Sequence, residues 1–141
     1  HLKVEIDDHP LQYIHGNGAL VATATGSTAY NLSAHGPIVM PDIRCFIITE
    51  LFDHNIPTPS IVIKRNCSIT ITVEDFRKLN KFVIADTGKN ADVILTADGL
   101  DIVALKKGDK IILKESKHEV RLVELEDHYF FKSLQEKFAF K

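Results

Sequence analysis

The sequence is organised around one stretch, GNGALVATATGSTAYNLSAHGP, which runs from Gly16 to Pro37. Residues 19–24 in its first half are mostly small, a run that predicts a buried strand. Gly26 lies just after this strand and is expected to end the extended run. We expect a short helix over residues 27–35 after the break. Ser27 is its expected N-cap, because serine oxygens accept hydrogen bonds from the free N–H groups at a helix start.

Further runs of β-branched residues lie on both sides of this stretch, and turn residues separate them. Asp8-His9-Pro10, residues 87–90 and Asp98-Gly99 predict turns. With residues 19–24, the expected strands cover residues 2–6, 11–14, 44–51, 60–64, 68–73, 81–85, 93–97, 102–105, 110–115 and 119–124. Short strands that recur about every 8–12 residues are typical of an all-β sandwich.

A second helix is expected at the end of the chain, over residues 128–138. Phe131, Leu134 and Phe138 recur there at helical spacing and form an apolar stripe. We expect the aromatic residues of this helix to pack on a sheet. The fold predicted for residues 1–141 is one domain, an all-β sandwich with one short inserted helix and a C-terminal helix.

The composition indicates a globular protein, with 45% hydrophobic residues, 26% charged residues and a net charge of −2. Basic residues are scattered among acids, so no nucleic-acid surface is expected. The chain has no apolar run long enough for a membrane span and no signal peptide, so a cytoplasmic location is expected. Cys45 and Cys67 lie in apolar runs and are expected to be free thiols. Since His1 opens the chain and Met40 is its only methionine, we expect a longer natural protein.

Hydroxyl groups are dense in the central stretch, at Thr23, Thr25, Ser27, Thr28, Tyr30 and Ser33. Such hydroxyls, beside the free N–H groups of a helix start, indicate a site for a phosphate or a ribose. Gly26 leaves room there for a ligand to approach the backbone. A structural alternative stays open, in which the hydroxyls only cap the helix and the small residues only allow tight packing. No Walker motif and no nucleophile elbow is present.

Residues 22–30, ATATGSTAY, are similar to the T-P-T-G-S-T-A-Y signature of the NAD kinase family, and residues 32–39 resemble its L-S-A-G-G-P-I-V continuation. The chain also resembles later sequence elements of the family, in the same order, at residues 98–99, 107–110, 120–123 and 129–137. The resemblance extends from about residue 11 to the C-terminus. It implies that the chain is the C-terminal, NAD-binding half of a two-domain protein.

The resemblance also implies where NAD binds, because this turn and helix embrace its adenosine and neighbouring sugar in the family. The implied NAD-binding residues are Asn17, Thr25, Gly26, Ser27, Thr28, Ala29, Tyr30 and Ser33. Tyr30 offers a flat ring and a phenolic hydroxyl that suit a ribose. Asn17 replaces an aspartate of the family, and His35 replaces a glycine. His15 and Phe52 match positions that reach across a subunit interface.

For the full-length protein, the resemblance implies transfer of the terminal phosphate of ATP, or of polyphosphate, to the 2′-hydroxyl of NAD, which gives NADP. The Gly-Gly-Asp-Gly-Thr loop that holds ATP phosphates in the family's N-terminal α/β domain is absent from this chain. No catalytic residue is therefore expected in residues 1–141, and ATP and Mg²⁺ are not expected to bind the chain alone. NAD or NADP, its own N-terminal domain and further copies in a homodimer or homotetramer are its expected partners.

Other functions stay open at this point. The chain could be a non-catalytic nucleotide-binding or interaction module, or a relative of the lipid and sphingoid kinases, which share the two-domain architecture. The TGSTAY run favours the NAD-binding branch over the lipid kinases. A metal site is not expected, because no His pair or Cys-His set has the spacing of zinc ligands.

Overall fold

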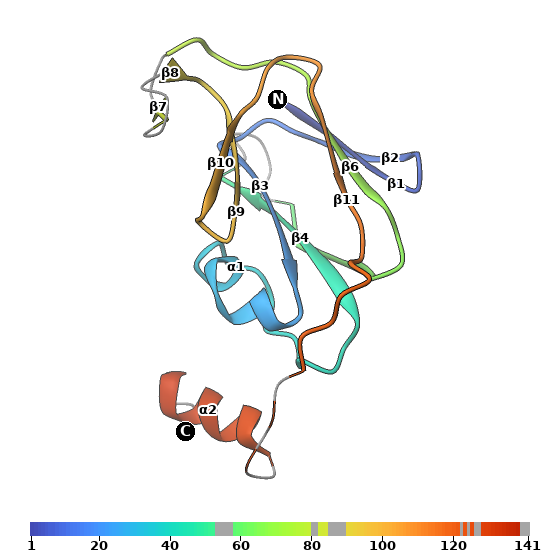
Figure 1. Cartoon of the computed structure of the whole chain (residues 1–141), viewed down its shortest axis with the longest axis vertical. Helices are drawn as coiled ribbons and strands as arrows, with labels where there is room; N and C mark the ends of the chain where they lie inside the picture. Colours follow the sequence, from blue (N-terminus) through green and yellow to red (C-terminus); the bar gives the residue numbers. More distant parts are fainter. Residues whose placement is uncertain are drawn as a thin grey trace.

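Two antiparallel sheets form the body of the chain in a computed structural model, which describes residues 1–52, 58–79, 82–84, 90–121, 123, 125 and 128–138 (Figure 1). The strands are β1 (Leu2–Ile6), β2 (His9–Ile14), β3 (Gly18–Thr23), β4 (Cys45–Leu51), β5 (Ile61–Lys64), β6 (Ile69–Val73), β7 (Phe82–Val83), β8 (Asn90–Ala91), β9 (Ile94–Ala97), β10 (Asp101–Ala104) and β11 (Lys110–Leu113). The helices are the 3₁₀ turn η1 (Thr25–Thr28), α1 (Tyr30–Ser33) and α2 (Tyr129–Phe138).

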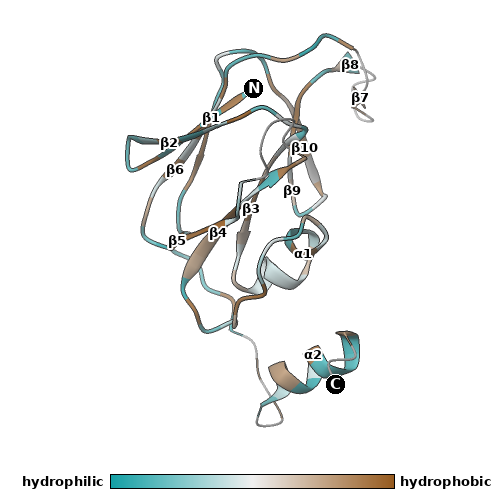
Figure 2. Cartoon of the chain, turned by 180° about the vertical axis from the view of Figure 1, so that it is seen from behind, coloured by the Kyte–Doolittle hydropathy of each residue, from teal (hydrophilic) through white to brown (hydrophobic). Residues whose placement is uncertain are grey.

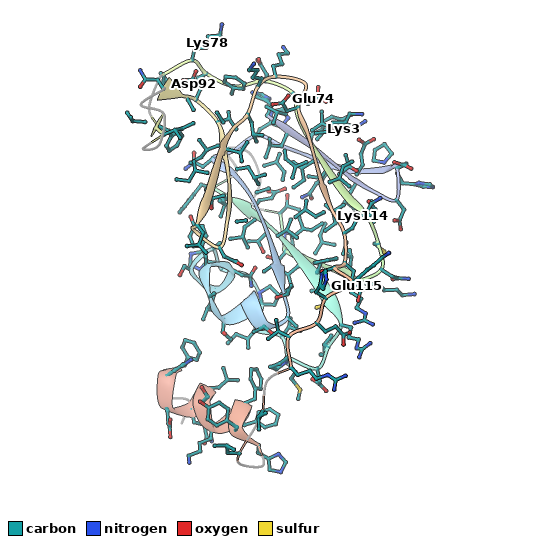
Figure 3. All side chains as sticks on the ribbon, in the orientation of Figure 1. Lys3, Glu74, Lys78, Asp92, Lys114 and Glu115 are labelled. Carbon is teal, nitrogen blue, oxygen red and sulfur yellow. The ribbon has the colours of Figure 1, made fainter. Side chains whose placement is uncertain are left out.

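The larger sheet has the strand order β11-β6-β1-β2, and the smaller one has the order β3-β4-β5. Their facing side chains form one apolar core of Val4, Ile14, Ile48, Ile69 and Ile71. Carbon-rich side chains fill the space between the sheets, whereas charged groups such as Lys3, Lys114 and Glu115 lie at their margins (Figure 3). The structure thus confirms the predicted all-β sandwich.

Strand β4 is buried on both of its faces. Ile48 points into the sandwich core, whereas Ile47 and Cys45 pack on the opposite face against Ala24. Adjacent residues of a strand point to opposite faces, so β4 needs cover on both sides. The segment that contains η1 and α1 supplies the second cover, because Ala24 immediately precedes it. The central stretch of the sequence therefore forms a third layer over the smaller sheet.

The turn between β1 and β2 differs from the prediction. It is formed by Asp7 and Asp8, whose φ angles of 49° and 64° are left-handed, and β2 already begins at His9. The predicted turn at Asp8-His9-Pro10 is therefore wrong. Aspartate tolerates the left-handed region, and Asp7 Oδ1 also accepts a hydrogen bond from the Ser68 N–H at 2.8 Å. Pro10 is tolerated in β2 because β2 is an edge strand.

In the later part of the chain, the structure confirms one expected hairpin and contradicts one expected strand. β9 and β10 pair on either side of the predicted Asp98-Gly99 turn, where both φ angles are positive. Strand β7 covers only part of the run expected over residues 81–85, and it pairs with β8. Residues 80–81 and 85–89 lie outside the described residues. The strand expected over residues 119–124 is wrong for its described part, because residues 119–121 and 123 form no strand.

Helix α2 confirms the predicted C-terminal helix but not its packing. Not one of its described side chains is buried, and Phe131 is 50% exposed. The helix lies apart from the sheets, with its hydrophobic and hydrophilic residues on different faces (Figures 1 and 2). The expectation of core packing is therefore wrong, because periodicity reports an apolar face but not what covers it. None of the described helices is long and apolar enough to span a membrane.

Candidate functional site

The central stretch leaves β3 and folds into two short helical pieces. Residues Thr25–Thr28 form η1, and Ala29, with φ −97° and ψ −132°, separates it from α1. The predicted continuous helix over residues 27–35 is therefore wrong. Its predicted N-cap is wrong too, because Ala24 precedes η1 and Ser27 lies within it.

Ser27 does not cap a helix because its side chain is used elsewhere. It is fully buried, and its Oγ accepts a hydrogen bond from the Val39 N–H at 3.0 Å and donates one to the Val39 carbonyl oxygen at 3.1 Å. This pair of bonds ties the chain that leaves α1 back to η1. A hydroxyl that is satisfied in this way stabilises the turn from inside.

Asn31 is the second buried polar residue of the turn, only 1% exposed. Its Nδ2 donates to the Ser27 carbonyl oxygen at 3.2 Å and to the Pro37 carbonyl oxygen at 3.1 Å. Its Oδ1 accepts a hydrogen bond from Thr49 Oγ1 on β4 at 2.8 Å. No sequence motif had singled out Asn31 as a functional residue. Its only local signal is the four-residue spacing from Ser27, which places both side chains on the inner side of the turn.

The outer side of the turn faces a hollow of about 750 Å³. Asn17, Ala29 and Tyr30 line it, and so do residues of β3, of the β9–β10 hairpin and of the core-facing sides of β1, β6 and β11. Figure 1 shows this hairpin beside β3 and the turn. The hollow thus brings together three of the eight predicted NAD-binding residues: Asn17, Ala29 and Tyr30. The other five, Thr25, Gly26, Ser27, Thr28 and Ser33, do not line it.

The hollow is mainly apolar, and several of its residues were not expected from the sequence. Phe82, Asp92 and Thr96 line it, from parts of the chain that no motif had linked to the central stretch. Asp98, predicted as a turn residue and as part of a later family element, lines it as well. Among the described lining residues there is no lysine, arginine or histidine. Such a surface suits a flat ring or a sugar better than a phosphate, which binds best to positive charge or to free N–H groups.

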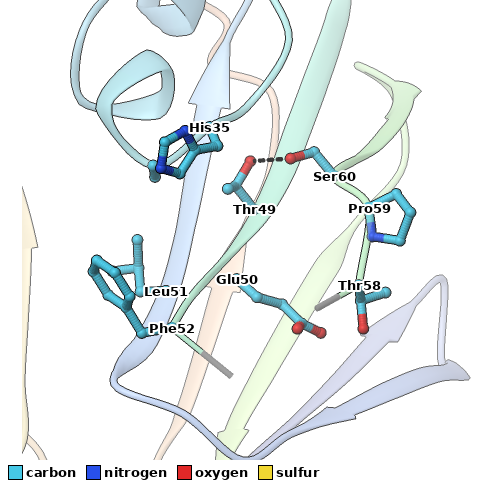
Figure 4. A pocket seen from close by; sticks show the side chains of 9 residues that line it. His35, Thr49, Glu50, Leu51, Phe52, Thr58, Pro59 and Ser60 are labelled. Atoms are coloured by element: carbon cyan, nitrogen blue, oxygen red, sulfur yellow. Dashed lines mark hydrogen bonds between the residues drawn. The ribbon is translucent and has the colours of Figure 1, made fainter. Parts of the chain in front are cut away.

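A smaller hollow of about 320 Å³ lies between the residues that follow α1 and the end of β4 (Figure 4). His35, Thr49 and Ser60 line it, and Thr49 and Ser60 share a hydrogen bond of 2.8 Å between their hydroxyl oxygens. Phe52, predicted for a subunit interface, lines it and is 73% exposed. His15, the other residue predicted there, lines neither hollow and packs edge-on against His1 at 4.2 Å between ring centroids.

Comparison with known proteins decides the family. Residues 1–125 match the family model described as the ATP-NAD kinase C-terminal domain. The chain belongs to this family. It is 34% identical over 140 residues to an NAD kinase of Lachnoclostridium phytofermentans, and 35% identical over 132 residues to one of Geobacter metallireducens. These alignments cover 99% and 94% of the chain but 46% and 42% of the relatives, so the chain spans less than half of their length.

Solved structures agree with this assignment. An NAD kinase from Archaeoglobus fulgidus in complex with ATP superposes with a TM-score of 0.65 and 25% identity, over 82% of this chain and 39% of that one. A yeast NADH kinase complexed with NADH gives a TM-score of 0.66 and 28% identity, over 79% and 28% of the two chains. The mostly β fold described above is thus the fold of ATP-NAD kinase C-terminal domains.

Neither cysteine of this ATP-NAD kinase C-terminal domain is set up as a nucleophile. Both are free, and burial raises the pKa of the Cys45 thiol. Desolvation, and then the neighbouring Asp7, raise the pKa of the Cys67 thiol. A thiol with a raised pKa stays protonated and unreactive at neutral pH. No group of three or more described His, Cys, Asp or Glu side chains could hold a metal ion.

His35 has a backbone conformation that explains why a glycine would suit this position. Its φ of 62° is left-handed, one residue after the C-cap Ala34 of α1, and its N–H donates to the Leu32 carbonyl oxygen at 3.0 Å. A residue that ends a helix in this conformation is most often glycine, because a Cβ is strained there.

We therefore expect His35→Gly to raise the free energy of unfolding by about 0.5–1 kcal/mol, since relief of left-handed strain outweighs the extra chain entropy of glycine. Urea unfolding measures the change. The matched control is Ala34→Gly, because Ala34 has an ordinary φ of −87°. This control should lose about 0.5–1 kcal/mol. A loss of stability in both variants would contradict the strain at His35.

Proposed function

We propose that this chain supplies the acceptor-nucleotide site of an NAD kinase. The intact protein transfers the terminal phosphate of ATP, or of polyphosphate, to the 2′-hydroxyl of NAD and so makes NADP. The observation that carries the proposal is the position of Tyr30 and Ala29. These two residues of the family signature lie on the wall of the larger hollow.

The chemistry of the hollow suits the adenosine part of NAD. Its walls are mainly apolar, Tyr30 is 62% exposed, and Asn17 is exposed as well. An aromatic ring can stack on a base or a sugar, while its hydroxyl and the Asn17 amide form hydrogen bonds to a ribose. Thr25, Thr28 and Ser33 offer further hydroxyls on the same turn, and Gly26 offers backbone. Ser27 contributes from inside, by holding the turn together.

In this proposal, the groups that act on the transferred phosphate belong to the part of the protein that this chain does not span. Phosphoryl transfer needs positioned cations around the phosphates, and the described walls of the hollow carry none. Mg²⁺ binds through one or two carboxylates together with substrate phosphates, so it belongs with ATP. The chain alone binds the acceptor nucleotide and does not catalyse phosphoryl transfer.

The proposal includes assembly as a homodimer or homotetramer, in which a second copy approaches His15 and Phe52. An aromatic side chain as exposed as that of Phe52 is a typical contact residue of protein interfaces. It also includes a cytoplasmic location, because two free thiols suit a reducing compartment.

Calorimetric titration of the folded chain with NAD, NADP and ATP tests the proposal. Saturable heat with NAD and NADP, and none with ATP, is the expected result. The same titration of the complete gene product, with an assay of NADP formation from NAD and ATP, completes the test. If neither the chain nor the gene product binds NAD, the proposed function is wrong.

A further inference from the structure

A continuous set of hydrogen bonds connects strand β4 to the inside of the signature turn. The Asn31 amide group bonds to two carbonyl oxygens, those of Ser27 and Pro37. A carbonyl oxygen only accepts, so the Asn31 NH₂ group must face both of them. The Asn31 Oδ1 is thereby directed to β4, where it can only accept.

The donor to Asn31 Oδ1 is the hydroxyl of Thr49 at 2.8 Å. This hydroxyl has one proton, which it gives to Asn31. In the bond of 2.8 Å between Thr49 and Ser60, the Ser60 hydroxyl therefore donates and Thr49 accepts. The direction of every bond from Ser60 to the turn is fixed. Figure 4 shows Thr49 on β4 with the bond to Ser60.

These bonds form in the interior, because Thr49 is 3% exposed and Asn31 is 1% exposed. Loss of the donor destabilises a buried amide oxygen, because the oxygen stays desolvated while its hydrogen bond within the protein is gone. Asn31 is adjacent in sequence to Tyr30, which lines the larger hollow from the opposite side of the turn. A change in the orientation of Asn31 therefore moves the backbone that carries Ala29 and Tyr30.

We propose that Thr49 and Asn31 are positioning residues for the acceptor nucleotide. Thr49 touches no part of the larger hollow, and it acts by holding Asn31 inward so that Ala29 and Tyr30 face that hollow. The inference rests on the proposed function for its ligand, whereas the geometry of the turn is independent of that ligand.

Three variants test the proposal. Thr49→Val removes the hydroxyl at nearly constant shape, and Thr49→Ser keeps it. Thr72→Val is the matched control, because Thr72 is also buried on a strand, at 8% exposure, but its hydroxyl has no hydrogen-bond partner among the described residues. Each variant is measured for amide hydrogen exchange without ligand and for NAD affinity by calorimetry. The amides of β1 report global stability in the same samples.

We expect Thr49→Val to speed amide exchange at residues 29–36, relative to β1, and to weaken NAD binding, each by about tenfold. Thr49→Ser and Thr72→Val should remain within about twofold of the wild type. Unchanged exchange at residues 29–36 in Thr49→Val, or no rescue by Thr49→Ser, would overturn the positioning role. Absence of NAD binding in the wild-type chain and gene product would instead overturn the proposed function, and the exchange data would still decide whether Thr49 holds the turn.

Discussion

Gly36→Ala is expected to lower the free energy of unfolding by about 2–4 kcal/mol, the largest stability loss that we predict. A Cβ at this buried position would lie 2.5 Å from Cγ and Nδ2 of Asn31, closer than real Cβ atoms approach. Either Asn31 moves and leaves its buried amide without partners, or the backbone after α1 shifts. Both responses disrupt the bonds that Asn31 makes to Ser27 and Pro37. Denaturant unfolding followed by circular dichroism measures the loss.

Gly26→Ala is the matched control for this prediction. A Cβ on Gly26 would meet only Ala22 Cβ and Thr23 Oγ1, both at 3.6 Å, which is ordinary contact. Alanine also favours a helical turn, so the change in stability should stay below about 1 kcal/mol. If Gly36→Ala unfolds at the same denaturant concentration as Gly26→Ala, Asn31 is not held as described.

Tyr30→Ala is expected to weaken NAD binding by about 10–100-fold and to leave the melting temperature nearly unchanged. Loss of an aromatic contact at the centre of a site costs about 1–3 kcal/mol of binding free energy. Folding loses little, because Tyr30 is 62% exposed in the absence of ligand. Calorimetric titration with NAD and a thermal melt of the same sample measure the two effects.

Tyr13→Ala serves as its control, because Tyr13 is equally exposed at 59% but lies on β2, away from both hollows. Its affinity for NAD should equal that of the wild type. Tyr30→Phe separates the contribution of the ring to NAD binding from that of the hydroxyl, since it keeps the stacking contact and removes one hydrogen bond. Equal NAD affinity in Tyr30→Ala and Tyr13→Ala would show that Tyr30 is not part of the binding site.

Local patterns in the sequence predicted most strands of the sandwich. Runs such as residues 44–51 and 68–73 were found because β-branched residues fit a pleated, buried surface wherever they occur. The Asp98-Gly99 hairpin was found because a left-handed turn needs residues of this kind. The TGSTAY run pointed to the family for a similar reason, since a motif lies within one continuous segment.

Predictions that depended on the partner of a segment were less successful. The apolar stripe of α2 is present, but no described residue of the helix is buried. Ser27 was predicted as a cap from its local position, yet its hydroxyl bonds to Val39, twelve residues away. The residues around a hydrogen-bond donor do not indicate which distant acceptor the donor will bond to.

The sequence by itself determined most of the strands, the position of the signature turn and the family of this chain, because each of these is encoded by neighbouring residues. Only the tertiary structure decided that β4 is covered on both faces, that the β9–β10 hairpin closes the hollow in front of Tyr30, and that Asn31 and Thr49 meet inside the turn. These features depend on contacts between segments far apart in the chain. Such contacts form only when apolar faces pack together, and packing joins faces by shape and burial rather than by any local motif.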